Sequence, residues 1–259
     1  MTSKPKFSSF LRHTLRALLN RNYRLFFAGQ IVSLTGTWIT NIATSWLVFR
    51  LTGSTLALGV VSFATQFPAF LAAPFMGLLV DRYDRRRLLL LTQTLSMLQS
   101  FTLAALTFTD RISVPWLVAL CVFQGIVNAL DMPCRQAFVL DIVEKRENLG
   151  NAIALNSSIF NAARLVGPAI GGVLIAAVGE AWCFFIDGVS YLAVIVSLAN
   201  IVLTVRRTVE APAGGPMRQF MEGLRYAAGF RPIRSLILLV ALVNLLCVPS
   251  LALMPAFAA

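Results

Sequence analysis

The connection between two long apolar runs reads Gly77-Leu78-Leu79-Val80-Asp81-Arg82-Tyr83-Asp84-Arg85-Arg86-Arg87. Asp81 stands where an apolar helix would leave a bilayer, and four arginines follow it closely. Such a carboxylate can pair with these cations or meet the N-terminus of a neighbouring helix. Gly77, one turn earlier, would let another helix approach closely. A short charged connection of this kind can hold one conformation until a competing interaction breaks it.

The composition of the whole chain indicates the same bilayer environment. Of its 259 residues, 58% are hydrophobic and only 13% are charged, and the mean hydropathy is +0.77. A soluble domain is about half apolar and about a quarter charged. These values exclude a disordered chain, a coiled coil and a collagen-like fibre, and they argue against a soluble enzyme.

Seven apolar stretches are long enough to cross a bilayer, which takes roughly 20 residues of helix. They are Leu25–Phe49, Leu56–Val80, Leu88–Phe108, Val114–Leu130, Ala152–Val178, Trp182–Val205 and Leu236–Phe257. The first is not a signal peptide, because its apolar part is too long and no small-residue cleavage site follows it. The expected fold class is an all-α membrane protein.

The composition changes between the sixth and seventh stretches. Residues 206–235 contain prolines and glycines and then the amphipathic stretch Met217–Phe230, which predicts a linker with a helix on the inner leaflet. The expected organisation is a basic N-terminal arm (1–24), a six-helix bundle (25–205), this linker, and the first helix of an incomplete second bundle (236–259). We therefore expect a chain truncated from twelve helices.

Positive charge is distributed unevenly among the connections. Nineteen of the 22 lysines and arginines lie in the N-terminal arm and in alternate loops, whereas the other loops hold only Arg50 and Arg111. This bias predicts a cytoplasmic N-terminus. Because the cations alternate with apolar runs, they indicate membrane orientation rather than nucleic-acid binding. The outward loops are a few residues long, so consecutive helices should be antiparallel neighbours.

The charged connection resembles the signature of the major facilitator superfamily, Gly-x-x-x-Asp-Arg/Lys-x-Gly-Arg/Lys-Arg/Lys. The matching residues, which would form a conformational gate, are Gly77, Asp81, Arg82, Arg85 and Arg86. Asp84 stands where that family usually has glycine, so the tight-turn geometry is in question. The simpler alternative is a stop-transfer cluster that only enforces topology.

A second motif lies in the fifth stretch, Gly167-Pro168-Ala169-Ile170-Gly171-Gly172. Glycines at this spacing present a smooth face for close helix packing. Pro168 removes a backbone hydrogen bond and permits a kink. The motif is similar to the span-five motif of antiporters in the superfamily, and a plain packing kink is the alternative.

Three further segments narrow the resemblance: Asn22-Tyr23-Arg24-Leu25-Phe26, Asp131-Met132-Pro133-Cys134-Arg135-Gln136-Ala137-Phe138 and Arg164-Leu165-Val166-Gly167-Pro168. They are similar to the enterobactin-exporter-like branch of the superfamily. This resemblance implies a bacterial inner-membrane exporter, with siderophore and drug efflux among the activities of the branch. It runs over essentially the whole chain, which corresponds to the first half of such a transporter plus one span.

Three charged residues within or at the ends of spans are candidates for substrate or coupling roles. Arg164 could bind an anionic substrate group or a coupling carboxylate, or it could lock helices in a structural pair. Asp187 could carry a proton, or it could be wetted by an outer vestibule. Asp131 should close the fourth span near the cytoplasm, and its spacing to Arg135 favours a local i,i+4 salt bridge.

Polar residues also form stripes on two helices. In the first span Gln30, Ser33, Thr37, Thr40 with Asn41, and Thr44 recur at helical spacing, and Gln124 and Asn128 do so in the fourth. Such stripes line an aqueous cavity or hydrogen-bond across helices. Spans one and four occupy corresponding places in two three-helix units, which inverted repeats bring together at the midplane.

The function expected is secondary active transport, with a proton-driven exporter of a small molecule working by alternating access. Its partners would be lipid, substrate, protons and a missing C-terminal bundle. The alternatives are a non-transporting half-transporter that acts as a scaffold or regulator, and an inactive truncated product. An intramembrane enzyme is disfavoured, because the chain shows no paired nucleophile and base.

No cofactor or metal is expected. The four cysteines are isolated and lie in or beside apolar segments, so they are typical of buried hydrophobes rather than disulfide or zinc ligands. The single histidine, His13, lies in the basic arm. The chain contains no Walker A sequence either.

Overall fold

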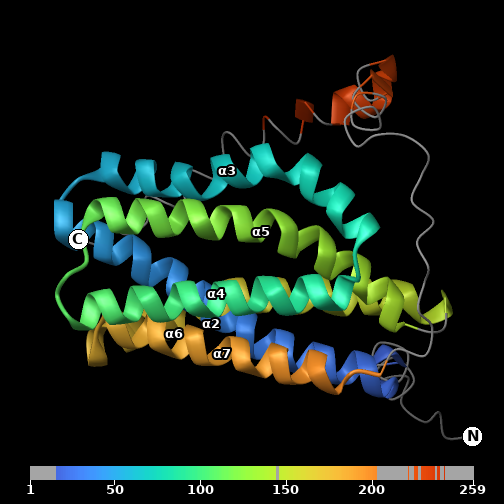
Figure 1. Ribbon diagram of the computed structural model, residues 1–259, viewed down its shortest axis with the longest axis horizontal. Helices are drawn as coiled ribbons and strands as arrows, with labels where there is room; N and C mark the ends of the chain where they lie inside the picture. Colours follow the sequence, from blue (N-terminus) through green and yellow to red (C-terminus); the bar gives the residue numbers. More distant parts are fainter. Residues whose placement is uncertain are drawn as a thin grey trace, which may run out of the picture.

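The computed structural model describes residues 16–143 and 146–202, and single residues and short stretches between 221 and 242. Its long helices lie side by side in one bundle (Figure 1). They are α2 (Arg21–Thr52), α3 (Thr55–Arg82), α4 (Arg85–Phe108), α5 (Val114–Ile142), α6 (Leu149–Val178) and α7 (Glu180–Asn200). Two short 3-10 helices, η1 (Arg16–Leu19) and η2 (Arg146–Asn148), precede α2 and α6.

Six of the seven predicted spans correspond to these helices. Five of them, α3 to α7, are long and apolar enough to cross a membrane by length and composition. The first predicted span, α2, is 32 residues long but is not among those five, because polar side chains recur along it. The seventh, Leu236–Phe257, and most of the predicted linker lie outside the described residues.

One helix boundary differs clearly from the sequence prediction. The fourth span was expected to end at Leu130, but α5 continues to Ile142. Asp131, which was expected to close this span, lies inside the helix and makes the predicted i,i+4 pair with Arg135 there. Asp131 therefore does not close the helix. In the other direction, α7 ends at Asn200, before the predicted Val205.

Local signals at the helix ends explain the antiparallel arrangement. The Asn20 side chain caps α2 by accepting from the backbone N–H groups of Asn22 (2.9 Å) and Tyr23 (3.2 Å). Gly53 ends α2 in the left-handed conformation, with φ 60°, and Ser54 caps α3 directly afterwards. Gly179, with φ 85°, is the only residue between α6 and α7. Connections this short force neighbouring helices to run in opposite directions.

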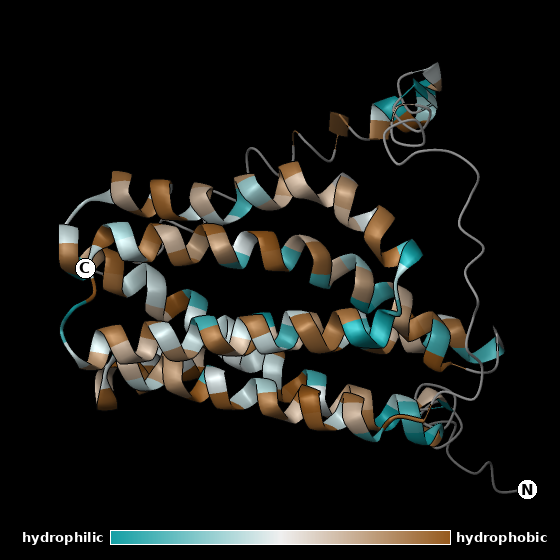
Figure 2. Cartoon of the chain, viewed as in Figure 1, coloured by the Kyte–Doolittle hydropathy of each residue, from teal (hydrophilic) through white to brown (hydrophobic). Residues whose placement is uncertain are grey.

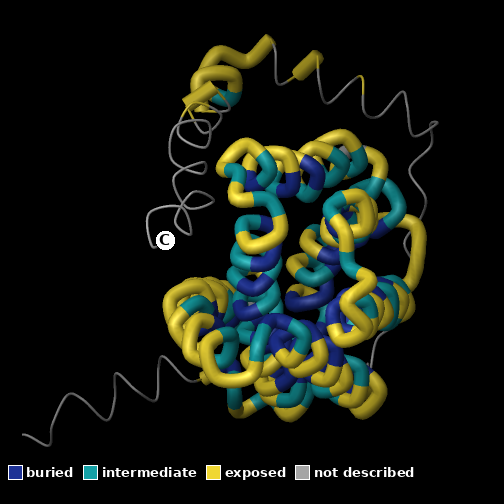
Figure 3. Tube along the Cα trace, turned by 90° about the vertical axis from the view of Figure 1, so that its left-hand side faces the viewer, coloured by how far each residue is buried: buried dark blue, intermediate teal, exposed yellow. Residues whose placement is uncertain are grey.

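The pattern of helix contacts is symmetric: it is unchanged when the first three long helices are interchanged with the last three. The most extensive contacts join α2 to α6 and α7, α5 to α3 and α4, and α4 to α7. Replacing α2, α3 and α4 by α5, α6 and α7 maps this set of pairs onto itself. Figure 1 shows α3 beside α5 on one side and α4 and α7 on the other. Figure 3 shows that the buried parts of the helices face the inside of the bundle and the exposed parts face outward. Two inverted three-helix units produce this packing.

The apolar core lies in two main clusters at the two ends of the bundle. One surrounds the α2 N-terminus and includes Phe26, Phe138 and Leu198. The other surrounds the opposite end of α2 and includes Leu47, Leu117 and Phe184. Many large apolar side chains are exposed on the outside of the bundle, which is the distribution expected of helices in lipid. Figure 2 shows hydrophobic residues along all the long helices. Polar side chains are concentrated between the two clusters.

Candidate functional site

A layer of buried polar side chains crosses the middle of the bundle. It draws on four helices, α2, α4, α5 and α7. Its buried members are Gln30, Ser33, Thr92, Gln93, Ser96, Gln99, Ser100, Asp131, Asp187 and Ser190. Polar and ionisable groups inside a membrane bundle are costly, so they mark a functional site by default. We call this set the polar layer.

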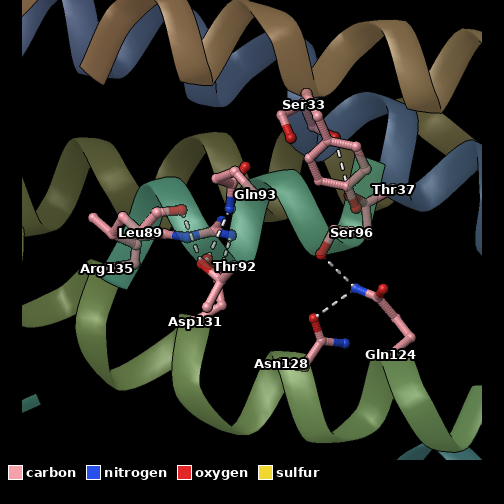
Figure 4. A network of polar contacts seen from close by, with 11 residues as sticks. Ser33, Thr37, Leu89, Thr92, Gln93, Ser96, Gln124, Asn128, Asp131 and Arg135 are labelled. Atoms are coloured by element: carbon pink, nitrogen blue, oxygen red, sulfur yellow. Dashed lines mark hydrogen bonds and ion pairs between the residues drawn. The ribbon is translucent and has the colours of Figure 1, made fainter. Parts of the chain in front are cut away.

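Asp131 is the centre of the first part of the layer, between α4 and α5. Gln93 Nε2 donates to Oδ1 of Asp131 over 2.7 Å, and the Thr92 hydroxyl lies 2.8 Å from the same oxygen. The Arg135 guanidinium pairs with Oδ2 (Figure 4). The predicted i,i+4 pair is therefore present, but it is buried and tied to α4. With one cation and two donors, the Asp131 carboxylate is compensated as an anion.

The predicted stripe on α5 faces the same layer. Gln124 Nε2 donates to Ser96 Oγ over 3.0 Å and to Asn128 Oδ1 over 3.1 Å. Figure 4 shows both residues projecting from α5 toward the polar side of α4. Asn128 is exposed, so this part of the layer is accessible from the surface of the bundle.

The stripe on α2 is divided between the interior and the surface. Gln30 is buried, and neither its amide nitrogen nor its amide oxygen has a hydrogen-bond partner among the described residues. The Thr37 hydroxyl lies 3.4 Å from the Tyr191 hydroxyl on α7. Asn41 is exposed. This helix thus carries both interhelical polar contacts and accessible polar groups, which are the two roles that the sequence left open.

Asp187 lies on α7, at a different depth from Asp131. Its side chain is 1% exposed, which contradicts the vestibule-wetted alternative. Ser100 Oγ on α4 donates to Oδ2 of Asp187 over 2.8 Å. The described residues place no lysine, arginine or histidine within ion-pair distance of this carboxyl.

Arg164 is not brought to the polar layer. It is exposed on α6, where its guanidinium lies over the Trp38 ring at 5.8 Å from the centroid. It makes no ion pair with a described carboxylate. The predicted structural ion pair of Arg164 is therefore not observed among the described residues, and its role toward substrate stays a prediction.

The glycine–proline motif packs α6 against α2. A Cβ at Gly167 would collide with Trp38 Cβ, and one at Gly171 would lie 3.4 Å from the Ile39 Cα. Gly172 faces open space. The helix runs unbroken through Pro168. The close packing expected of this motif therefore applies to Gly167 and Gly171 and not to Gly172.

The charged connection between α3 and α4 is organised differently from the prediction. Arg85 pairs with Asp141 on α5, at 2.8 and 2.9 Å, and Arg86 donates to the Ala199 carbonyl on α7 over 2.8 Å. Asp81 is exposed and makes no ion pair with the described part of the chain, so pairing with the arginines, one of the two alternatives for this carboxylate, is not observed. Arg82 is also exposed.

Asp84 and Gly77 show how this connection relates to the family pattern. Asp84 has φ −61° and caps α4 by accepting from the Arg87 N–H over 3.0 Å, so this position needs no glycine. Gly77 has no neighbouring atom within 4 Å of a Cβ built on it. A close helix approach at Gly77 is not made by the described residues.

The polar face of α4 was missed by the sequence analysis. Thr92, Gln93, Ser96, Gln99 and Ser100 lie within a stretch that was taken only as a membrane span. Their spacing of three and four residues places them on one helix face, and this periodicity was the available signal. Among the described residues, no group of three or more histidine, cysteine or acidic side chains could hold a metal ion.

Six antiparallel helices, packed as two inverted three-helix units around a polar layer, form the half-bundle architecture of secondary transporters. Comparison with known families agrees. The profile of the family described as transmembrane secretion effector matches residues 13–259, and the chain belongs to this family of the major facilitator superfamily. The resemblance drawn from the charged connection is thereby confirmed.

Several curated relatives are similar to the chain over part of their length. The staphyloferrin A transporter of Staphylococcus aureus is 31% identical over 171 residues, which cover 63% of this chain and 43% of that protein. The multidrug efflux pump Tap of Mycolicibacterium fortuitum is 27% identical over 204 residues, 74% of this chain and 48% of the pump. Macrolide efflux protein A of Streptococcus pyogenes is 27% identical over 158 residues, 59% of this chain and 38% of that protein. The chain thus spans about half or less of the relatives that it matches.

Proposed function

We propose that this chain is the N-terminal part of a proton-driven exporter of small organic molecules in a bacterial inner membrane, with a cytoplasmic N-terminus. The observation that carries the proposal is the polar layer, enclosed between two apolar clusters and reaching the surface at Asn128. Burying polar and ionisable groups in a membrane bundle is costly, so this layer supports a functional role. The cation bias of the loops supports the orientation.

The relatives support export and the kind of substrate. Their names include a siderophore transporter, a multidrug efflux pump and a macrolide efflux protein. The substrate of this chain would accordingly be a drug-like or siderophore-like molecule with an apolar body and a few polar groups. The hydrogen-bonding side chains of Gln124, Asn128 and Asn41 would contact those polar groups.

A second six-helix bundle would complete the pathway, and the outer face of α3 is its proposed docking surface. This face exposes large aromatic side chains at Phe63, Phe67 and Phe70. It ends at Gly77, where no described residue comes within 4 Å of a Cβ, and at Asp81, which makes no ion pair in the described part of the bundle. Rocking of the two bundles about the polar layer would expose it alternately to the two sides.

Efflux from cells tests the proposal. The complete protein would be produced in a bacterial strain that lacks its own drug pumps, and accumulation of a fluorescent macrolide and of a siderophore would be followed with and without a protonophore. We expect lower accumulation of at least one compound, which the protonophore restores. Equal accumulation with and without the protein would refute export, and efflux that persists after collapse of the proton gradient would refute proton coupling.

A double variant on α5 tests the polar side chains beside the polar layer, and a variant on α6 is its matched control. Gln124→Leu with Asn128→Leu removes the accessible polar groups from α5 and leaves its apolar packing positions intact. This variant should fold and lose efflux, whereas Ser158→Ala, an exposed α6 residue whose hydroxyl bonds only its own helix, should retain it.

A further inference from the structure

Asp187 is a carboxyl group enclosed on all sides by uncharged groups. It is 1% exposed and lies where α2, α4 and α7 meet. From α4 it receives the Ser100 hydroxyl at 2.8 Å, and from its own helix the Ser190 hydroxyl lies 3.4 Å from Oδ1. From α2, the backbone at Gly36 and the Thr40 side chain face it.

The two carboxyl groups of the polar layer have opposite environments. Asp131 has the Arg135 guanidinium on one oxygen and two donors on the other. Asp187 has hydroxyl groups only, and no cation in the described structure reaches it. An ionised carboxylate buried without a cation is strongly unfavourable, and the group binds a proton instead. In the conformation observed, Asp187 is therefore expected to be a neutral acid.

The charged and titratable groups around Asp187 are few. The described parts of α2 and α4 present none to it, since Thr40, Gln99 and Ser100 are neutral. On α7 the nearest is the Tyr191 phenol, one turn away, whose hydroxyl lies by Thr37. A phenol is neutral at physiological pH. Among the described residues, nothing nearby except a bound proton can thus compensate the Asp187 carboxylate.

We propose that Asp187 is the site at which this transporter binds the proton that it exchanges for substrate, a proposal that rests on the proton-driven export proposed above. On release, the O–H bond of the Asp187 acid breaks, the proton passes to water, and the anion keeps the hydrogen bond from Ser100. On uptake the reverse occurs at the same oxygen atoms. No other co-reactant is needed.

Gly36 brings α2, the helix that carries the polar stripe, into contact with the Asp187 carboxyl. A Cβ at Gly36 would lie 2.7 Å from Oδ1 of Asp187 and 2.5 Å from Ser190 Oγ, so the backbone of α2 is pressed against the carboxyl. Such close packing leaves no room for a hydrated metal cation but accommodates a proton. An anion formed here must recruit water, which requires α2 to move away from α7. Because α2 also carries Gln30, Thr37 and Asn41, loss of the proton changes the polar layer that faces substrate.

The carbonyl-stretch band of a carboxylic acid in the infrared spectrum tests the charge state directly. The complete protein, purified and reconstituted in lipid, would be measured over a series of pH values. We expect an acid band at neutral pH that shifts in heavy water, disappears in Asp187→Asn, and persists in Asp131→Asn, because the Asp131 carboxylate is paired with Arg135. An acid band that survives in Asp187→Asn, or none in the wild type at neutral pH, would overturn the proposal.

Two hydroxyl variants test the same assignment in case Asp187→Asn does not fold. Ser100→Ala removes the hydrogen bond to the acid, so its band should move to higher frequency. Thr102 lies on the same helix, but its hydroxyl donates to the Leu98 carbonyl and not to Asp187. The acid band of Asp187 should therefore stay in place in Thr102→Ala. An unmoved band in Ser100→Ala would contradict the assignment to Asp187.

Transport separates this proposal from the proposed function. In proteoliposomes, Asp187→Asn should lose proton-driven uphill transport, at least tenfold, and retain exchange of labelled for unlabelled substrate. If the wild type shows no proton-driven transport, the proposed function fails while the infrared result still stands. If the variant transports uphill as well as the wild type, Asp187 is not the proton site although the function holds.

Discussion

Arg85, the first residue of α4, binds both oxygens of Asp141 near the end of α5, at 2.8 and 2.9 Å. The two side chains come from distant parts of the sequence and are 16% and 20% exposed. The contact ties the charged connection to the bundle interior. It also leaves Asp81, the acidic residue of the same motif, free of any ion pair with the described helices.

Arg85→Ala should destabilise the bundle because it leaves a largely buried Asp141 without its cation. We expect a loss of about 1–3 kcal/mol, between the values for surface and buried pairs. Thermal unfolding in detergent would measure it, with Arg87→Ala, at an exposed position of the same run, as the control. A double-mutant cycle with Asp141→Ala should show coupling, and additive effects would disprove the pair.

Asp84→Ala should destabilise the first turn of α4, because it removes the side chain that caps this helix. We expect the free energy of unfolding to fall by about 1 kcal/mol in Asp84→Ala. In Asp84→Gly, which restores the family pattern, it should fall by only about 0.3 kcal/mol. Melting temperatures of the two variants provide the measurement. A glycine variant more stable than the wild type would mean that this turn needs the left-handed conformation after all, in conflict with its φ of −61°.

Gly125→Ala should separate α3 from α5, since its Cβ would collide with the Thr65 carbonyl oxygen, a backbone atom that cannot turn aside. We expect destabilisation of about 1–3 kcal/mol. Gly172→Ala is the matched variant on α6, because no described residue lies within 4 Å of its Cβ. Equal unfolding temperatures for the two variants would show that α3 and α5 do not approach closely at this point.

Arg135→Ala should be the most damaging substitution among the arginines of the bundle. It leaves Asp131, 5% exposed, as an uncompensated buried charge, and about 3–5 kcal/mol is expected. Arg164→Ala removes only an exposed contact with Trp38 and should cost less than about 1 kcal/mol. Folded yield and unfolding temperature distinguish the two. Similar losses would contradict the placement of Asp131 in the interior.

Asp81→Asn should leave the stability of the isolated bundle unchanged, because no described residue pairs with this carboxylate. In the complete protein we expect at least a tenfold loss of transport, since the proposed docking surface for the second bundle ends at Asp81. Unfolding of the bundle and efflux by the complete protein are measured separately. Undiminished efflux would remove Asp81 from the interface between bundles.

Part of the site could be predicted from sequence because helical periodicity is local. Spacing alone placed Gln124 and Asn128 on one face and paired Asp131 with Arg135, and both relationships are present in the structure. Periodicity on α4 held the same kind of signal for Thr92, Gln93 and Ser96, but the surrounding leucines concealed it. The partners of Asp131 on α4 and of Arg85 on α5 could not be predicted, since they depend on how helices face one another.

Hydropathy, length and cation bias by themselves determined the helical membrane class, the helix order and the expected orientation. These properties follow from the transfer of apolar segments and charges between water and lipid, which depends on composition and not on neighbours. Only the tertiary structure decided that Asp131 is compensated and Asp187 is not. That difference arises from desolvation and from the presence or absence of a cation within a few ångströms, and both are set by the packing of α2, α4, α5 and α7.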